Sequence, residues 1–95
     1  MTEKLKDPGH AARYLTKALE AGDPANLQGA LLDVIQAQGG YHVVAAQGGL
    51  SEWRLKLMLW DDEEVYKLIR LAKLLKGMGM RLVIVAVKEE IKTRK

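Results

Sequence analysis

The residues with the most obvious chemical potential in this 95-residue chain are four consecutive carboxylates and two histidines. Asp61–Glu64 could supply oxygen ligands to a divalent cation or an acid–base pair. The same run precedes a helical pattern, where the helix dipole favours negative charge, and we prefer this second interpretation. His10 and His42 are too far apart in sequence to build a metal site alone. Because the chain also has no cysteine, thiolate chemistry is excluded, and we expect neither an enzyme nor a bound metal or cofactor.

The most informative stretch is 41–60, whose spacing is typical of a helix-turn-helix unit. With Tyr41 as its first position, the small Ala45 stands where the second helix must cross closely. Gly49 stands where the backbone turns sharply, often at positive φ. Ser51 is suited to cap the second helix. The positions that should hold the two helices together are apolar: Leu50, Leu55 and Met58.

The elements around this unit are marked by helix start and stop signals. Asp7-Pro8 and Asp23-Pro24 each offer a capping oxygen followed by proline at the first helical position. Gly22 closes the first of these two segments. Apolar residues at helical spacing predict helices near 8–21, 25–38 and 63–76. We therefore expect a mainly α fold in a single domain over residues 1–95, since this length is one domain's worth of chain.

Met80–Lys88 differs from the rest because its apolar, β-branched run predicts a strand. The remaining residues, 89–95, are polar and basic, and we expect them to fray. No second strand is evident in the chain, yet the main-chain polar groups of a strand need partners. Pairing with the same strand of a second subunit, antiparallel about a two-fold axis, is the simplest solution. The edge of a partner protein's sheet is another, and a helix that packs inward is the alternative to a strand. The side chains that we expect at such an interface are Leu82, Ile84 and Ala86.

The overall charge gives only a weak indication of a nucleic-acid partner. The chain carries a formal charge of +3 with a pI near 9.3. Residues 1–50 have four basic and five acidic side chains, whereas residues 51–95 have eleven and seven, so a polyanion would favour the second half. The polar start is not a signal peptide, and the longest apolar run, Leu82–Val87, is too short to cross a membrane. We expect a cytoplasmic protein.

Taken together, these segments resemble a known family of antitoxins. The family is that of the HigA-like addiction-module antidote proteins, which have a lambda-repressor-like (Xre-type) helix-turn-helix. The resemblance covers roughly residues 7–87 and rests on Asp7-Pro8, Gly22-Asp23-Pro24, Gly39-Gly40, Val44-Ala45, Gly49-Leu50-Ser51 and Gly79-Met80-Arg81-Leu82. It implies a five-helix DNA-binding domain with a C-terminal strand. It also implies a protein that neutralises a cognate toxin and represses its own operon.

The second helix of the motif departs from this family in a way that leaves two functions open. Where the family commonly has Ser-Arg-Glu, this chain has Ser51-Glu52-Trp53. Bases are read mainly by Arg, Lys, Asn and Gln, and few outward positions here carry them. For a DNA-binding autorepressor, the expected contacts are Tyr41, His42, Ser51, Glu52, Arg54 and Lys56, with basic side chains of the last helix near phosphates. For a protein-interaction module that has lost base reading, the expected interface is instead the apolar stripe of Trp53, Leu57 and Trp60.

Overall fold

The protein is a bundle of helices followed by a segment without regular structure. The computed structural model describes residues 3–61 and 63–87. Within these ranges a short 3-10 helix precedes five α helices. They are η1 (Lys4–Lys6), α1 (Pro8–Ala21), α2 (Pro24–Ala37), α3 (Tyr41–Gly48), α4 (Glu52–Trp60) and α5 (Glu63–Gly77). The predicted mainly α class and the predicted helices are therefore confirmed for the described part of the chain.

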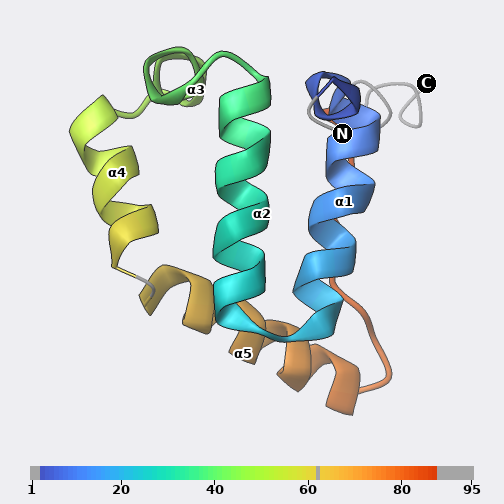
Figure 1. Cartoon of the computed structure of the whole chain (residues 1–95). Helices are drawn as coiled ribbons and strands as arrows, with labels where there is room; N and C mark the ends of the chain where they lie inside the picture. The colour runs from blue at the N-terminus through green and yellow to red at the C-terminus, as the bar shows by residue number, and fades with distance from the viewer. Residues whose placement is uncertain (1–2, 62, 88–95) are drawn as a thin grey trace.

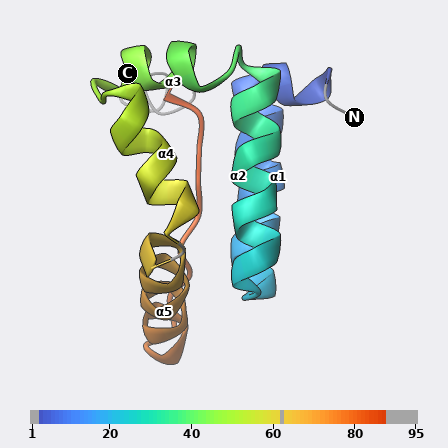
Figure 2. The ribbon, with the colours of Figure 1, turned by 60° about the vertical axis from the view of Figure 1, so that its left-hand side comes forward.

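The helices are arranged around the antiparallel pair α1 and α2 (Figure 1). In that view α3 and α4 lie beside α2, and α5 crosses near the ends of α1 and α2 where these two helices are joined. Figure 2 shows the α1–α2 pair on one side of the molecule, with α4 and α5 following one another on the other side. The start of α4 and the end of α5 consequently lie at opposite ends of the molecule.

Local sequence signals set the helix boundaries, with one exception. The Asp7 side chain caps α1 by accepting a hydrogen bond from the His10 main-chain nitrogen at 3.1 Å. Gly22 ends this helix in the left-handed conformation, at φ 76°. Asp23 occupies the N-cap position of α2, but its side chain makes no capping hydrogen bond. The expectation of a second Asp capping oxygen is therefore wrong, and the cap at Asp23 is made only by its carbonyl, which accepts from Leu27 N at 3.0 Å.

Three buried clusters connect the elements. The first joins α1, α2 and α5 through Leu19, Leu27, Val65 and Ile69. The second joins α2, α3 and α4 through Ile35, Ala45, Leu55 and Leu59. The third joins η1, α1 and α2 through Leu5, Ala11 and Ala37. Because α2 contributes to all three, it is the central helix of the fold.

Polar contacts add to this packing between helices. The Tyr14 hydroxyl on α1 donates to Asp33 Oδ2 on α2 at 2.8 Å. This hydrogen bond raises the pKa of Tyr14 above its ordinary value, and desolvation and the Asp33 charge act in the same direction. The Gln28 side-chain amide on α2 donates to the carbonyl of Leu59 on α4.

The C-terminal segment, residues 80–87, is not a strand in the described part of the chain. Figure 1 shows it returning past α1 as a drawn-out trace. Thr16 on α1 holds it, because Thr16 Oγ1 accepts a hydrogen bond from Ile84 N at 2.9 Å. The single hydroxyl proton of Thr16 is directed to the Ala12 carbonyl at 2.8 Å, with the Ile84 carbonyl as a second, longer acceptor at 3.3 Å. Residue 88 of the predicted strand and the predicted fraying of residues 89–95 lie outside the described residues.

Burial alternates along the C-terminal segment, and this changes the expected interface. Leu82 and Ile84 pack against the first buried cluster, and Ala86 is also buried. The side chains that we expected to meet another chain therefore contact the protein's own interior. The exposed set is Val83, Val85 and Val87. A partner along this segment would meet these valines, because alternate residues of an extended chain point to opposite sides.

Candidate nucleic-acid interface

Two helices, α3 and α4, and the turn between them occupy the stretch that the sequence predicts as a helix-turn-helix unit. Gly49 ends α3 at φ 73°, in the left-handed region where glycine carries no steric penalty. The Leu50 amide then donates to the Ala45 carbonyl at 2.9 Å, which closes the turn. Ser51 Oγ accepts from the Arg54 main-chain nitrogen at 3.0 Å and so caps α4. The turn at Gly49 and the cap at Ser51 were predicted from the sequence.

The packing of the two helices follows the predicted pattern at Ala45 and Leu55 only. Ala45 is buried in the second cluster together with Leu55 and Leu59 of α4. Its single methyl group allows α3 and α4 to approach closely. Leu50 and Met58, both predicted to help hold the two helices together, are partly exposed instead. The apolar contact of α4 with the rest of the protein therefore depends on Leu55 and Leu59.

The structure brings several of the predicted DNA-contacting side chains together at the start of α3 and α4. Glu52 is their centre: its carboxylate lies 3.3 Å from Lys56 Nζ and 3.5 Å from His42 Nδ1. Lys56 Nζ also lies 5.4 Å from the centre of the Tyr41 ring. Arg54 is exposed on α4, and Ser51 has its hydroxyl oxygen engaged in the cap.

The electrostatics of this surface are weak for a DNA-binding protein. Glu52 partly neutralises Lys56, which is the clearest candidate for a base or phosphate contact. The pair is exposed, so it can rearrange at little cost when a stronger anion arrives. Arg54 has no acidic partner among the ion pairs of the described residues. Arg54 is therefore available to contact an anion directly, whereas Lys56 becomes available after it separates from Glu52.

The predicted apolar stripe is present on the surface of α4. Trp53 is 70% exposed, Trp60 is 86% exposed and Leu57 is 46% exposed. A shallow hollow of about 360 Å³ borders Trp53 and Leu57, and its rim carries Arg54, Asp61 and Glu64. Another, of about 500 Å³, lies beside Trp60 and reaches Tyr41 and Lys56. Apolar and charged candidates therefore share one helix surface.

The acidic run next to α4 marks the start of a helix, as preferred from the sequence. Asp61 Oδ1 accepts a hydrogen bond from the Glu63 main-chain nitrogen at 3.2 Å. Glu63 and Glu64 lie in the first turn of α5, where the dipole favours them. In the part of the chain that the structure describes, no group of three acidic or histidine side chains is placed to hold a metal ion.

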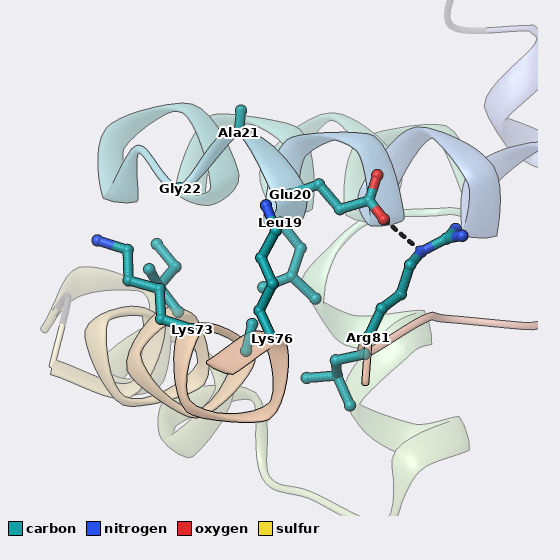
Figure 3. Close-up of a pocket in the computed structure, with 10 residues that line it drawn as sticks. Leu19, Glu20, Ala21, Gly22, Lys73, Lys76 and Arg81 are labelled. Carbon is teal, nitrogen blue, oxygen red and sulfur yellow. Dashed lines mark hydrogen bonds and ion pairs between the residues drawn. The ribbon is translucent and has the colours of Figure 1, made fainter. Parts of the chain in front are cut away.

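The basic side chains at the end of α5 do not join this surface. Lys73 and Lys76 lie beside the C-terminal turn of α1 (Figure 3), at the other end of the molecule from the start of α4. That basic side chains of the last helix lie near phosphates stays a prediction, and Lys73 and Lys76 lie away from the start of α4. Helical position alone could not reveal this, since it depends on how α5 packs.

Sequence reasoning missed two features of the structure. Thr16, which anchors Ile84, gave no signal because an isolated threonine inside a helical pattern is unremarkable. Alternating burial in residues 82–87 was hidden because every position in that run is apolar. Both the role of Thr16 and the inward face of residues 82–87 depend on the contact between α1 and the C-terminal segment, which local sequence patterns do not reveal.

No protein-family model, curated protein or solved structure matches this chain. In the described ranges, no helix is both long and apolar enough to cross a membrane.

Proposed function

We propose that this chain is a helix-turn-helix DNA-binding protein that acts as an autorepressor and antitoxin. The observation that carries the proposal is the α3–turn–α4 geometry, in which Gly49 turns the chain and Ser51 caps an exposed α4. In this motif the second helix enters the major groove with its N-terminal residues at the base edges. The antitoxin role is supported by the sequence resemblance described above.

The proposed contacts divide between bases and phosphates. Arg54 and Lys56 reach base edges or nearby phosphates from α4, since both are exposed hydrogen-bond donors. Tyr41, His42 and Ser51 contact the backbone and set the position of the helix. Glu52 releases Lys56 on binding. Its carboxylate can accept from a cytosine amino group, which favours sequence choice, while its charge opposes overall affinity.

The proposed active form is a homodimer formed through the C-terminal segment. One helix-turn-helix unit makes few contacts, and two units on a two-fold axis read two half-sites. In the described chain, the main-chain hydrogen bonds from residues 81–87 to the helices are those of Ile84 with Thr16. Antiparallel pairing with a second copy gives the other main-chain groups partners and covers Val83, Val85 and Val87.

A second candidate function is favoured by the apolar side chains of α4. Trp53 and Trp60 are highly exposed, whereas tryptophan in folded proteins is on average largely buried. Tryptophan is also enriched at the hot spots of protein interfaces. In this function α4 meets a toxin or another protein and binds no DNA. Its partner would be the product of an adjacent reading frame that copurifies with this chain.

A DNA titration separates the two functions. Fluorescence anisotropy of labelled DNA from upstream of the chain's own gene should report submicromolar to micromolar binding that weakens steeply as salt rises from about 50 to 200 mM. Arg54→Gln and Lys56→Gln should each weaken binding several-fold, because each removes a contact. Lys17→Gln, on the exposed surface of α1, is the control with the same charge change. Absence of salt-sensitive binding in the micromolar range would reject the autorepressor and leave the protein-interaction function.

A further inference from the structure

A hollow of about 530 Å³ lies between the C-terminal turn of α1 and the C-terminal half of α5 (Figure 3). Its base is apolar and is made by Leu19, Ile69, Ala72 and Leu82. Leu19 and Ile69 belong to the first buried cluster, and Ala72 and Leu82 pack against it. The base of the hollow is therefore continuous with the rigid interior of the protein.

Three cationic side chains border this apolar base. Lys73 and Lys76 come from α5, and Arg81 comes from the start of the C-terminal segment. Figure 3 shows Lys76 reaching from α5 toward α1 and Lys73 directed toward Gly22. Among the residues that the structure describes, the only carboxylate on the rim is Glu20, whose Oε2 lies 2.6 Å from Arg81 Nε. This pair leaves two lysines as an excess of positive charge over the hollow.

The helix dipole explains part of this arrangement. The last turn of α1 contains no basic residue, so Lys73 and Lys76 supply positive charge to its negative end from another helix. Such an effect needs cations near the helix end, but it does not require an open hollow with an apolar base beneath them. The combination of base and rim is typical of ligand sites, which are mostly apolar with a few convergent polar groups and occupy about 300–1,000 Å³.

We propose that this hollow binds a small amphipathic anion. Lys73 and Lys76 neutralise its carboxylate or phosphate head, and Arg81 donates through the N–H groups that Glu20 does not occupy. An unbranched apolar body covers Leu19, Ile69, Ala72 and Leu82, which gains the free energy of apolar burial. The site lies apart from α4, so it goes beyond the proposed DNA-binding function.

Decanoate is the probe for this site because it combines a carboxylate with a flexible apolar chain. Titrated into the ¹⁵N-labelled protein below its micellar concentration, it should shift amide resonances around Gly22, Ala72 and Leu82 with saturation. Acetate keeps the head without the apolar body, and decyltrimethylammonium keeps the apolar body with the opposite charge. Neither should produce saturable shifts at these residues. Equal shifts with either control probe, or no shifts with decanoate at millimolar concentration, would overturn the proposal.

Variants test whether the named side chains hold the anion. The double variant Lys73→Gln with Lys76→Gln should weaken decanoate binding about tenfold or more, because it removes both uncompensated charges. Ala72→Leu retains every charge and should weaken binding by filling the base of the hollow. Lys67→Gln, on the same helix but outside the hollow, should bind as the unmodified protein does. Equal weakening by Lys67→Gln would show only a general charge effect and would also overturn the site.

Two further measurements complete the test. The amide spectrum of each variant without ligand establishes that it is folded, so that loss of binding cannot be attributed to unfolding. Vesicles containing phosphatidylglycerol present a similar anionic amphiphile as a surface. Binding to these vesicles without binding of free decanoate would assign the cations to a membrane surface and reject the small-molecule site. Failure of DNA binding would leave this result unaffected.

Discussion

Glu52 is the side chain whose charge most directly opposes the proposed DNA contact. It faces both Lys56 and His42 at ion-pair distance at the start of α4, where phosphates would approach. In the free protein it keeps the exposed lysine in place. In a complex it would repel the DNA backbone, so the net effect of this carboxylate on affinity is unfavourable.

Glu52→Gln should therefore raise affinity for DNA several-fold and make its salt dependence steeper, because Lys56 becomes free to neutralise a phosphate. Anisotropy titrations at several salt concentrations measure both quantities. Glu3→Gln removes another exposed carboxylate that pairs with a lysine, Lys6, and changes the net charge equally. A similar gain in the Glu3→Gln control would attribute the effect to overall charge.

Tyr14 gives a second prediction at the residue scale, concerning stability against pH. Its pKa is raised in the folded protein, chiefly because its hydroxyl donates to Asp33. The stabilisation is thus fully present below the unfolded-state value of about 10 and is lost as pH rises through the folded-state value. Tyr14→Phe should cost at most about 1 kcal/mol near neutral pH, and its difference from the unmodified protein should shrink at higher pH.

Urea denaturation at pH 8 to 11.5 checks this prediction. Tyr66→Phe changes an exposed tyrosine on α5 and serves as the control. The stability of this variant should depend on pH as that of the unmodified protein does. A constant difference between Tyr14→Phe and the unmodified protein across this range would contradict the role assigned to the hydrogen bond with Asp33.

At the scale of elements, α4 has a side-chain cap at its start and α2 does not. Ser51 caps α4 with its hydroxyl, whereas Asp23 stands at the corresponding position of α2 without a side-chain hydrogen bond. Ser51→Ala should lower the free energy of unfolding by about 1 kcal/mol, and Asp23→Ala by clearly less. Urea denaturation of the two variants measures this contrast. Equal losses would mean that the cap geometry does not determine the stability of α4.

The C-terminal segment yields a further prediction at this scale. Sedimentation of the unmodified protein should report a monomer–dimer equilibrium that shifts with concentration. Val85→Lys should keep the protein monomeric, because it places a charge in the exposed row that faces the second copy. Leu74→Lys changes an exposed apolar residue of α5 and should leave association unchanged. If the unmodified protein stays monomeric at high concentration, pairing through this segment is contradicted.

For the molecule as a whole, local signals predict the helices well. Proline, capping residues and Gly22 or Gly49 act within a few residues, so the boundaries of α1, α3 and α4 follow from the sequence. The contacts between helices and segments that are distant in the sequence cannot be predicted from these local signals. The inward face of residues 82–86 is set by Thr16 and the first buried cluster.

The candidate site shows the same division between local and long-range information. Glu52 and Lys56 are four residues apart on one helix, so their contact could be anticipated from helical spacing. The shared exposed face of the tryptophans follows from the same spacing. His42 joins Glu52 only because α3 packs against α4. Lys73 and Lys76 lie beside α1 and away from the start of α4 because of the crossing of α5, which periodicity does not determine.

The proposed DNA-binding surface is α4, and its two tryptophans, the only ones in the chain, report on it directly. Acrylamide quenching of tryptophan fluorescence should be strong in the free protein and should fall when upstream DNA is added at low salt. High salt should restore the acrylamide quenching, because the protein–DNA complex dissociates. Quenching that DNA leaves unchanged, at concentrations where anisotropy reports binding, would place the DNA on another surface and contradict the account.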